Sequence, residues 1–272
     1  MMDRVKINNQ EYSVEMHQRK KHLPRLLMLH GFMGDHRAFD HLIDRLCESC
    51  NPVTIDLLGH GDSSKPADPT RYDESHQVDD IVQLIYSLNL FPLLLYGYSM
   101  GGRLALKTAL HKPTLFDGLI LESTNCGISD PQKRRERRRT DAARAKEIEE
   151  DFEQFLAGWS RLDLFESPLG VDESLSQKYQ AIQLEQSPNA LSASLCGFGT
   201  GSMSPVCNTL STLNLPILLL GGSADEKYQE INQYLAEHLP NATFSSIKAG
   251  HRVHLDNPSV LINEISNFLN RF

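Results

Sequence analysis

The sequence predicts an α/β fold, with a mostly parallel central sheet, helices on both of its faces and an inserted helical lid. Short, continuously apolar segments alternate with amphipathic segments of helical period, which is typical of a parallel sheet covered on both sides. This alternation stops between residues 125 and 207, where the sequence is charged and helical. A Gly-x-Ser-x-Gly motif joins one predicted strand to the next predicted helix, a placement that fits the same fold class.

A hairpin and six further strands make up the predicted sheet. Residues 5–16 alternate apolar and polar side chains around Asn8 and Asn9, a pair that suits a tight turn. The further strands are expected at residues 25–31, 52–59, 92–99, 118–123, 215–222 and 242–251. The covering helices are expected at residues 39–49, 76–89, 101–112, 227–239 and 258–269.

The interval between residues 125 and 207 contains no convincing buried strand. Its apolar points are the aromatic side chains of Phe152, Phe155, Trp159 and Phe165. A helical insertion between two core strands would cover the strand ends as a lid. We therefore expect an α/β core of residues 1–124 and 208–272, interrupted by a helical lid of residues 125–207.

The composition is that of a globular protein. With 272 residues, 40% of them apolar and 23% charged, the chain is long enough to bury a sizeable core. The N-terminal residues do not resemble a signal peptide, and no segment has the roughly 18 apolar residues of a membrane span. We therefore expect a soluble, cytoplasmic protein without a membrane span.

The cysteines point to a reducing compartment. There are five, an odd number spread along the chain, which argues against a disulfide framework. Cys47 and Cys50 form a Cys-x-x-Cys pair, but no second pair at zinc-ribbon spacing accompanies them, and a structural zinc site needs four ligands. We expect two thiols around the end of a helix, with no metal and no cofactor.

The net charge of −8 hides an asymmetry. Residues 133–146 hold eight Lys or Arg side chains against Glu136 and Asp141, a local charge of +6 that leaves −14 for the remainder. Nucleic-acid-binding domains are more often basic as a whole, so we expect no nucleic-acid partner. The basic run itself fits either a solvated helix face or an anion-binding role.

The strongest chemical signal is Gly97-Tyr98-Ser99-Met100-Gly101, between a predicted strand and a predicted helix. A chain that reverses from strand to helix within two residues strains the serine, and side chains at positions 97 and 101 would collide with neighbouring backbone. This explains the two glycines. We therefore predict that Ser99 is the reactive serine of an α/β-hydrolase fold.

A serine hydroxyl needs a general base within hydrogen-bond reach to react at neutral pH. In this fold the acid and then the histidine follow the serine, each on a loop after a later strand. Asp225 and His251 both fit this order and placement. Asp225 could instead cap the helix that follows it. His254 is the rival of His251, although it lies one turn into the next segment.

Two backbone N–H groups are expected to form an oxyanion hole. Met100 follows the serine directly, and Phe32 lies in the segment HGFMG (30–34) after an early strand. Arg103 lies about one turn into the nucleophile helix, near its positive end, so a negative group should compensate it. A core carboxylate and a substrate carboxylate are equally suited to that role.

The segments around these residues resemble one family. HGFMG, DLLGHGDS (56–63) and GYSMGGRLAL (97–106) recur in many α/β hydrolases. More selective are the segments RRRTDAARA (137–145), FLAGWSRLDLF (155–165), GSADEKY (222–228) and AGHRVHLDNP (249–258). Over nearly its whole length the chain is similar to the 2-succinyl-6-hydroxy-2,4-cyclohexadiene-1-carboxylate synthases of menaquinone biosynthesis.

The resemblance implies a lyase. Ser99, activated by His251 and Asp225, would abstract a proton from carbon, and pyruvate would be eliminated to leave a cyclohexadiene. The oxyanion hole would then hold the charge of an enolate, with no acyl-enzyme. By motif position, the pocket for this small substrate with several carboxylates would be lined by Tyr98, Arg103, Arg137 and Trp159.

One departure from the family concerns the lid. Members usually carry a further arginine shortly before the segment matching SPNALSASL (187–195). The nearby positions here are Gln183 and Leu184, and no arginine occurs from 171 to 200. The recognition of carboxylates is therefore expected to differ.

Two other functions fit parts of the pattern. A hydrolase of carboxylic esters or carbon-carbon bonds would use the same triad for acyl transfer, and a ligand receptor could use the same fold without catalysis. The cationic lid with Trp159 favours the lyase over an esterase, and the intact triad argues against a receptor. No feature of the sequence sets an oligomeric state.

Overall fold

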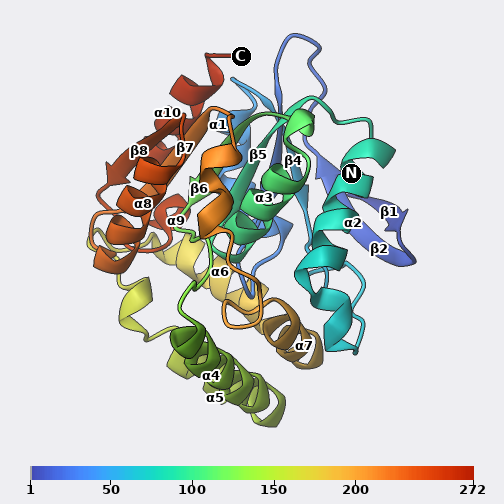
Figure 1. Ribbon diagram of the computed structural model, residues 1–272, viewed down its shortest axis with the longest axis vertical. Helices are drawn as coiled ribbons and strands as arrows, with labels where there is room; N and C mark the ends of the chain where they lie inside the picture. Colours follow the sequence, from blue (N-terminus) through green and yellow to red (C-terminus); the bar gives the residue numbers. More distant parts are fainter. Residues whose placement is uncertain (1) are drawn as a thin grey trace.

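The computed structural model describes residues 2–272 and forms one eight-stranded sheet (Figure 1). The strands are β1 Met2–Ile7, β2 Gln10–Met16, β3 Arg25–Leu29, β4 Asn51–Ile55, β5 Leu93–Tyr98, β6 Phe116–Glu122, β7 Ile217–Gly222 and β8 Ala242–Ile247. Their order in the sheet is β1-β2-β4-β3-β5-β6-β7-β8. β1 and β2 pair antiparallel with each other, as do β2 and β4, and every pair from β4 to β8 is parallel.

The expected hairpin and all six further strands are present. Asn8 and Asn9 lie in the hairpin turn with φ of 47° and 63°, the left-handed conformation that asparagine tolerates. β4 ends at Ile55, four residues before the expected end at residue 59. The chain turns there because Gly59 and Gly61 adopt φ of 84° and 49°, which an extended strand cannot contain.

Helices cover both faces of the sheet, as the sequence predicts. The five expected helices are α1 Asp40–Leu46, α2 Glu74–Ser87, α3 Met100–His111, α8 Glu226–His238 and α10 Pro258–Leu269. Alternate strand residues point to opposite faces: Leu27 and Leu29 join the apolar cluster of α2, α3 and α8, whereas Leu26 and Met28 join that of α1 and α10. Among residues 2–272, no helix is long and apolar enough to cross a membrane.

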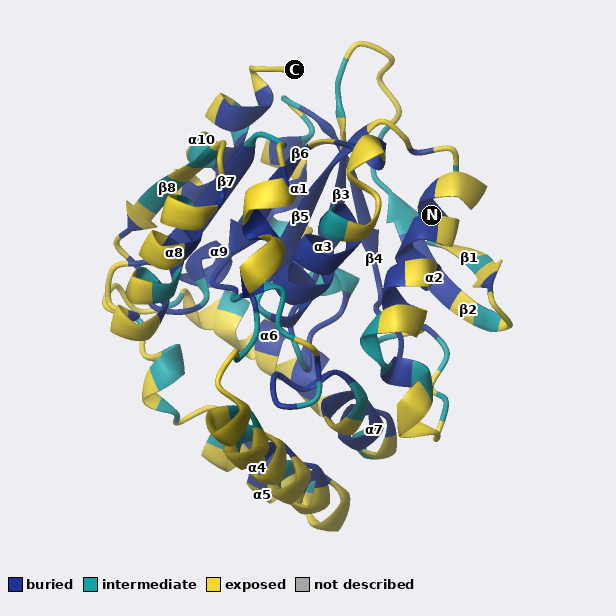
Figure 2. Cartoon of the chain, viewed as in Figure 1, coloured by how far each residue is buried: buried dark blue, intermediate teal, exposed yellow. Residues whose placement is uncertain are grey.

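Four helices lie between β6 and β7: α4 Pro131–Glu150, α5 Phe152–Trp159, α6 Glu173–Leu184 and α7 Pro188–Phe198. They gather at one end of the sheet (Figure 1). Ile148, Phe155, Leu191 and Leu195 form a small apolar cluster of their own, which Met33 joins from the loop after β3. Figure 2 shows that the outer surface of α4 is largely exposed. These helices, which we call the lid helices, account for the interruption seen in the sequence.

The cysteine prediction is wrong for one pair. Cys126 and Cys207 form a disulfide across 81 positions of sequence, at the two ends of the segment that carries the lid helices. Their spacing in the sequence gives no sign of this pairing, because only the return of the chain from the lid brings them together. Cys47, Cys50 and Cys196 are free, and Cys47 lies at the C-terminal end of α1 as expected. The cytoplasmic location stays a prediction.

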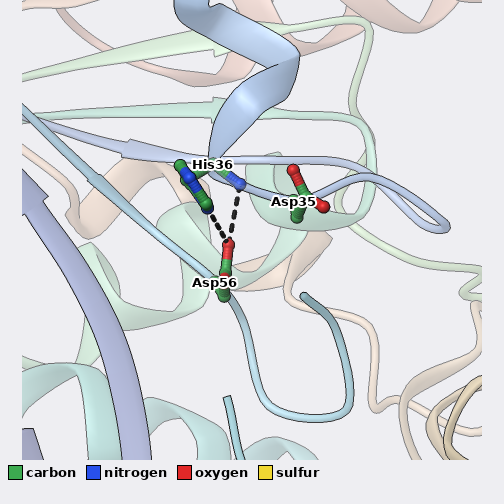
Figure 3. A group of neighbouring side chains, drawn as sticks. All are labelled: Asp35, His36 and Asp56. Carbon is green, nitrogen blue, oxygen red and sulfur yellow. Dashed lines mark hydrogen bonds and ion pairs between the residues drawn. The ribbon is translucent and has the colours of Figure 1, made fainter. Parts of the chain in front are cut away.

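A group of ionisable side chains braces the loops after β3 and β4 (Figure 3). Asp56 Oδ1 accepts hydrogen bonds from the backbone N–H of His36 at 2.8 Å and from its Nδ1 at 2.7 Å. Asp35 accepts hydrogen bonds from Arg37 and from Gln186, which follows α6. Because protein donors already bind both carboxylates, we interpret the group as a structural brace. It holds the loop that contains Phe32 against the lid helices.

Candidate active site

Ser99 lies at the sharp turn between β5 and α3. Its φ of 50° and ψ of −105° are strained for a residue with a side chain. A Cβ atom at Gly97 would lie 2.5 Å from the carbonyl oxygen of Gly101, and one at Gly101 would lie 2.3 Å from that of Leu29. Both glycines are therefore required for β3, β5 and α3 to approach closely enough to form the turn.

The structure brings Ser99, His251 and Asp225 together in one hydrogen-bonded chain. His251 Nε2 lies 3.2 Å from Ser99 Oγ, and its Nδ1 lies 2.7 Å from Asp225 Oδ2. With Nδ1–H donating to the carboxylate, Nε2 is free to accept the serine proton. Asp225 Oδ1 also accepts the backbone N–H of Tyr228 at 3.2 Å, so this aspartate caps α8 as well.

His254 has a different partner. It lies in the short helix α9 Val253–Asp256, where its Nδ1 is 2.8 Å from Glu122 Oε1. Glu122 ends β6, and its other oxygen accepts a hydrogen bond from the Tyr96 hydroxyl. The carboxylate is fully buried, which alone raises its pKa, but His254 and the hydrogen bonds outweigh burial and lower it. The pair lies beneath Tyr98, whose ring centroid is 4.4 Å from that of His254.

Phe32 and Met100 border the same cavity as Ser99. Throughout residues 2–272, neither backbone N–H has a hydrogen-bond acceptor. Two free donors beside a serine can stabilise an oxyanion or an enolate, and loss of one such donor typically costs about 10² to 10³ in rate. The structure places both residues at the serine, where the sequence expects them, and their role as an oxyanion hole stays a prediction.

A cavity of about 550 Å³ opens above Ser99. The core supplies the triad and the start of α3, and the lid helices supply the other walls. The four expected substrate-binding residues all line it, namely Tyr98, Arg103, Arg137 and Trp159. The fold therefore brings these four residues, which span positions 98 to 159 of the sequence, to the same cavity as Ser99.

Arg103 is buried in this cavity without a carboxylate partner. Among the described residues its side chain makes one hydrogen bond, a long one of 3.4 Å from the guanidinium to the carbonyl oxygen of Phe198, and its Nε has no acceptor. Burial lowers the pKa of Arg103 to about 10. Of the two compensating groups considered for this arginine, no core carboxylate forms an ion pair with it among residues 2–272, although the charge of Asp141 acts on it from a greater distance. A substrate carboxylate stays a prediction.

The basic run on α4 has a side that lines the cavity and an exposed side, and an anion-binding role for it stays a prediction. Arg137 forms an ion pair with Asp141 at 2.7 Å and lines the cavity, and Arg144 stacks over the ring of Trp159 at 5.2 Å. The exposed basic residues of α4 are Lys133, Arg135, Arg138, Arg139 and Lys146, of which Arg138 also donates a hydrogen bond to the carbonyl oxygen of Gly201. The inner face therefore adds positive charge to the cavity, and the outer face is solvated.

Among the cationic residues that line the cavity, sequence reasoning did not single out Arg144, Lys227 and Arg252. Lys227 and Arg252 directly follow motif positions, two residues after Asp225 and one after His251. Proximity to the triad in the sequence was the available signal. Gln183, at the departure from the family pattern, also lines the cavity.

Comparison with known proteins supports this picture. Residues 24–258 match the family described as alpha/beta hydrolase fold. A Bacillus subtilis (strain 168) protein, provisionally named as a 2-succinyl-6-hydroxy-2,4-cyclohexadiene-1-carboxylate synthase, is 35% identical over 90% of this chain and 89% of its own length. The synthase of the same name from Serratia proteamaculans is 31% identical over 90% of this chain and 93% of its own length.

Solved structures of other proteins have the same fold as this chain. The structure of MenH from S. aureus superposes with a TM-score of 0.90 at 31% identity, covering 96% of this chain and 98% of that one. An esterase from Exiguobacterium antarcticum has a TM-score of 0.85 at 21% identity, covering 99% of this chain and all of that one. At that identity, the likeness to the esterase concerns the fold alone.

Proposed function

The chain belongs to the 2-succinyl-6-hydroxy-2,4-cyclohexadiene-1-carboxylate synthases of the α/β-hydrolase fold family, and from this we propose how its site performs the reaction. The enzyme is a lyase of menaquinone biosynthesis, which eliminates pyruvate from 2-succinyl-5-enolpyruvyl-6-hydroxy-3-cyclohexene-1-carboxylate. One observation carries the proposed mechanism. A hydrogen-bonded serine, histidine and aspartate share a cavity with a buried, unpaired arginine.

In the proposed mechanism Ser99 acts as a base. His251 takes the hydroxyl proton, and the alkoxide removes a proton from the ring carbon beside the succinyl carbonyl. The electrons of that C–H bond pass into the carbonyl as an enolate, which the N–H groups of Phe32 and Met100 stabilise. Collapse of the enolate forms a double bond from the deprotonated carbon to its ring neighbour, shifts the existing ring double bond by one position, and breaks the C–O bond to the enolpyruvyl group. Pyruvate leaves as its enolate and takes up the proton held by His251.

The roles of the remaining residues follow from charge. The substrate bears three carboxylates, and Arg103 and Arg137 offer cations in the cavity, while Tyr98 and Trp159 add aromatic surface. We propose that residues 125–207 act as a lid that completes this cavity, on a core of residues 1–124 and 208–272. The ligand we propose is a small multi-carboxylate. No nucleic acid and no cofactor enter the mechanism.

Replacing Arg103 by alanine is expected to lower kcat/KM for pyruvate release by about ten- to a hundredfold. A charge-assisted hydrogen bond to a carboxylate contributes about 1.5 to 3 kcal/mol, and 1.36 kcal/mol corresponds to a factor of ten in rate. The measurement is pyruvate release from the succinyl-enolpyruvyl substrate at several concentrations. Any activity toward small neutral esters should change much less.

Arg161→Ala is the matched control, because Arg161 is exposed and lies outside both the cavity and the basic helix α4. Its kcat/KM should equal that of the wild type. If Arg103→Ala releases pyruvate as fast as the wild type, the reaction stands but our account of substrate recognition is wrong. If the wild type releases no pyruvate at all, the lyase mechanism itself is wrong.

A further inference from the structure

Arg252 lines the catalytic cavity, yet the mechanism above gives it no role. It follows His251 in the loop between β8 and α9 and is half-buried. Its guanidinium carbon lies 4.7 Å from the ring centroid of Phe165 and 5.4 Å from that of Tyr179. Two aromatic rings therefore hold the guanidinium in one place, as cation–π contacts do.

The guanidinium of Arg252 has no hydrogen-bonded carboxylate among residues 2–272, although the charge of Asp256 acts on it from a greater distance. No carboxylate of residues 2–272 forms an ion pair with it, and its Nε is buried without an acceptor. Its one hydrogen bond is a long one, 3.4 Å to the carbonyl oxygen of Phe165. Asp256, one helical turn further, instead accepts the backbone N–H of Gly250 at 2.7 Å. A bound anion would supply the hydrogen-bond acceptor that the buried Nε lacks.

Arg252 and Arg103 lie on different sides of the cavity. Arg103 lies over the ring of Phe198 at the end of α7, 5.6 Å from its centroid. Arg252 instead contacts Tyr179 of α6 and Phe165 of the short helix η4 Asp163–Phe165. The cavity therefore carries unpaired cations on two sides, which suits a ligand with carboxylates at separate positions.

Arg252 lies on the same side of the cavity as Gln183, near the position where family members carry a further lid arginine. Tyr179 and Gln183 are four residues apart on α6, so their side chains lie next to each other on one face of the helix. Both line the cavity, and both are buried. A cation placed at position 183 would therefore project beside the Tyr179 ring against which Arg252 packs.

We propose that Arg252 binds a substrate carboxylate on the α6 side of the cavity and replaces, from the core, the cation that the lid does not provide at Gln183. This inference rests on the proposed function, and it assigns Arg252 to substrate recognition. Arg252 lies on the core loop that also carries His251. The rings that hold its guanidinium belong to the lid segment, so the carboxylate is bound where the lid meets the core.

The test removes the cation at position 252 and then introduces one at position 183. Arg252→Ala is expected to raise KM for the succinyl-enolpyruvyl substrate about tenfold with little change in kcat, because the lost contact is made equally in the ground and transition states. Adding Gln183→Arg to Arg252→Ala should recover most of the loss. Millimolar guanidinium should also lower the KM of Arg252→Ala and leave the wild type unaffected. Arg161→Ala, in an exposed lid arginine outside the cavity, is the matched control.

The outcomes separate this inference from the mechanism beneath it. An unchanged KM in Arg252→Ala, measured while the wild type releases pyruvate, overturns the inference and leaves the lyase intact. A raised KM that neither Gln183→Arg nor guanidinium lowers shows that Arg252 only packs the lid against the core, and this also overturns it. Absence of pyruvate release by the wild type would instead contradict the proposed function.

Discussion

Replacing Ser99 by alanine is expected to lower kcat for pyruvate release by about 10³-fold, within the 10² to 10⁴ that a positioned general base contributes. The reason is geometric. Ser99 lines the cavity at the strained turn, and in the proposed mechanism His251, whose Nε2 lies 3.2 Å from the serine hydroxyl, acts on the substrate through that hydroxyl. Stopped-flow or coupled measurement of pyruvate at saturating substrate checks the prediction.

Two further measurements interpret that result. Ser160→Ala, in an exposed serine of the lid, should behave as the wild type. A loss of only tenfold or less in Ser99→Ala would mean that His251 removes the carbon-bound proton itself, contrary to our mechanism. Mass spectrometry of enzyme quenched during turnover should show unmodified Ser99, since an acyl adduct would require ester-type chemistry in place of elimination.

Replacing Glu122 by leucine is expected to destabilise the fold by about 3 to 5 kcal/mol, the usual cost of removing one partner from a buried charged pair. The loss leaves the Nδ1 and backbone N–H of His254 and the hydroxyl of Tyr96 buried without an acceptor. Denaturant unfolding measures the difference in free energy. The melting temperature should fall by on the order of 10 °C.

The difference in unfolding free energy between wild type and Glu122→Leu should depend on pH, because it arises from the ionised carboxylate of Glu122. The pKa of Glu122 is lowered in the folded protein from its ordinary value of 4.5. The folded state therefore binds fewer protons than the unfolded state in this range. The stabilisation is fully present above about pH 4.5 and is lost as the pH falls through the folded pKa. The difference in unfolding free energy between wild type and Glu122→Leu should accordingly become smaller in acid. Glu237→Gln, in an exposed glutamate of α8, should leave stability unchanged at every pH.

The parts of the structure that could be predicted are those set by local sequence. Continuous apolar runs locate the parallel strands because both faces of such strands are buried. Gly97 and Gly101 locate the nucleophile turn because only glycine fits the contacts there. The order of serine, acid and histidine then places Asp225 and His251 at the ends of β7 and β8. Each of these inferences needs only neighbouring residues and the topology of the sheet.

The parts that could not be predicted depend on how distant segments meet. Glu122 and His254 are 132 positions apart, and nothing in either local sequence indicates their pairing. The disulfide between Cys126 and Cys207 likewise depends on the lid returning to its starting point. Whether an arginine is paired or free is also a property of the assembled cavity. For that reason Arg252 acquires a role only once the structure is known.

The exposed basic face of α4 has a consequence for the speed of substrate capture. Residues 133–146 carry a charge of +6 and the remainder of the chain −14, so most of the surface repels a tricarboxylate while the helix beside the cavity attracts it. Such a field steers diffusional encounters toward the cavity, and the steering weakens as the Debye length shrinks from about 10 Å at 0.1 M salt to about 3 Å at 1 M. Added salt therefore slows turnover when substrate is scarce, and it leaves the rate at saturation, which no longer depends on encounter, nearly unchanged.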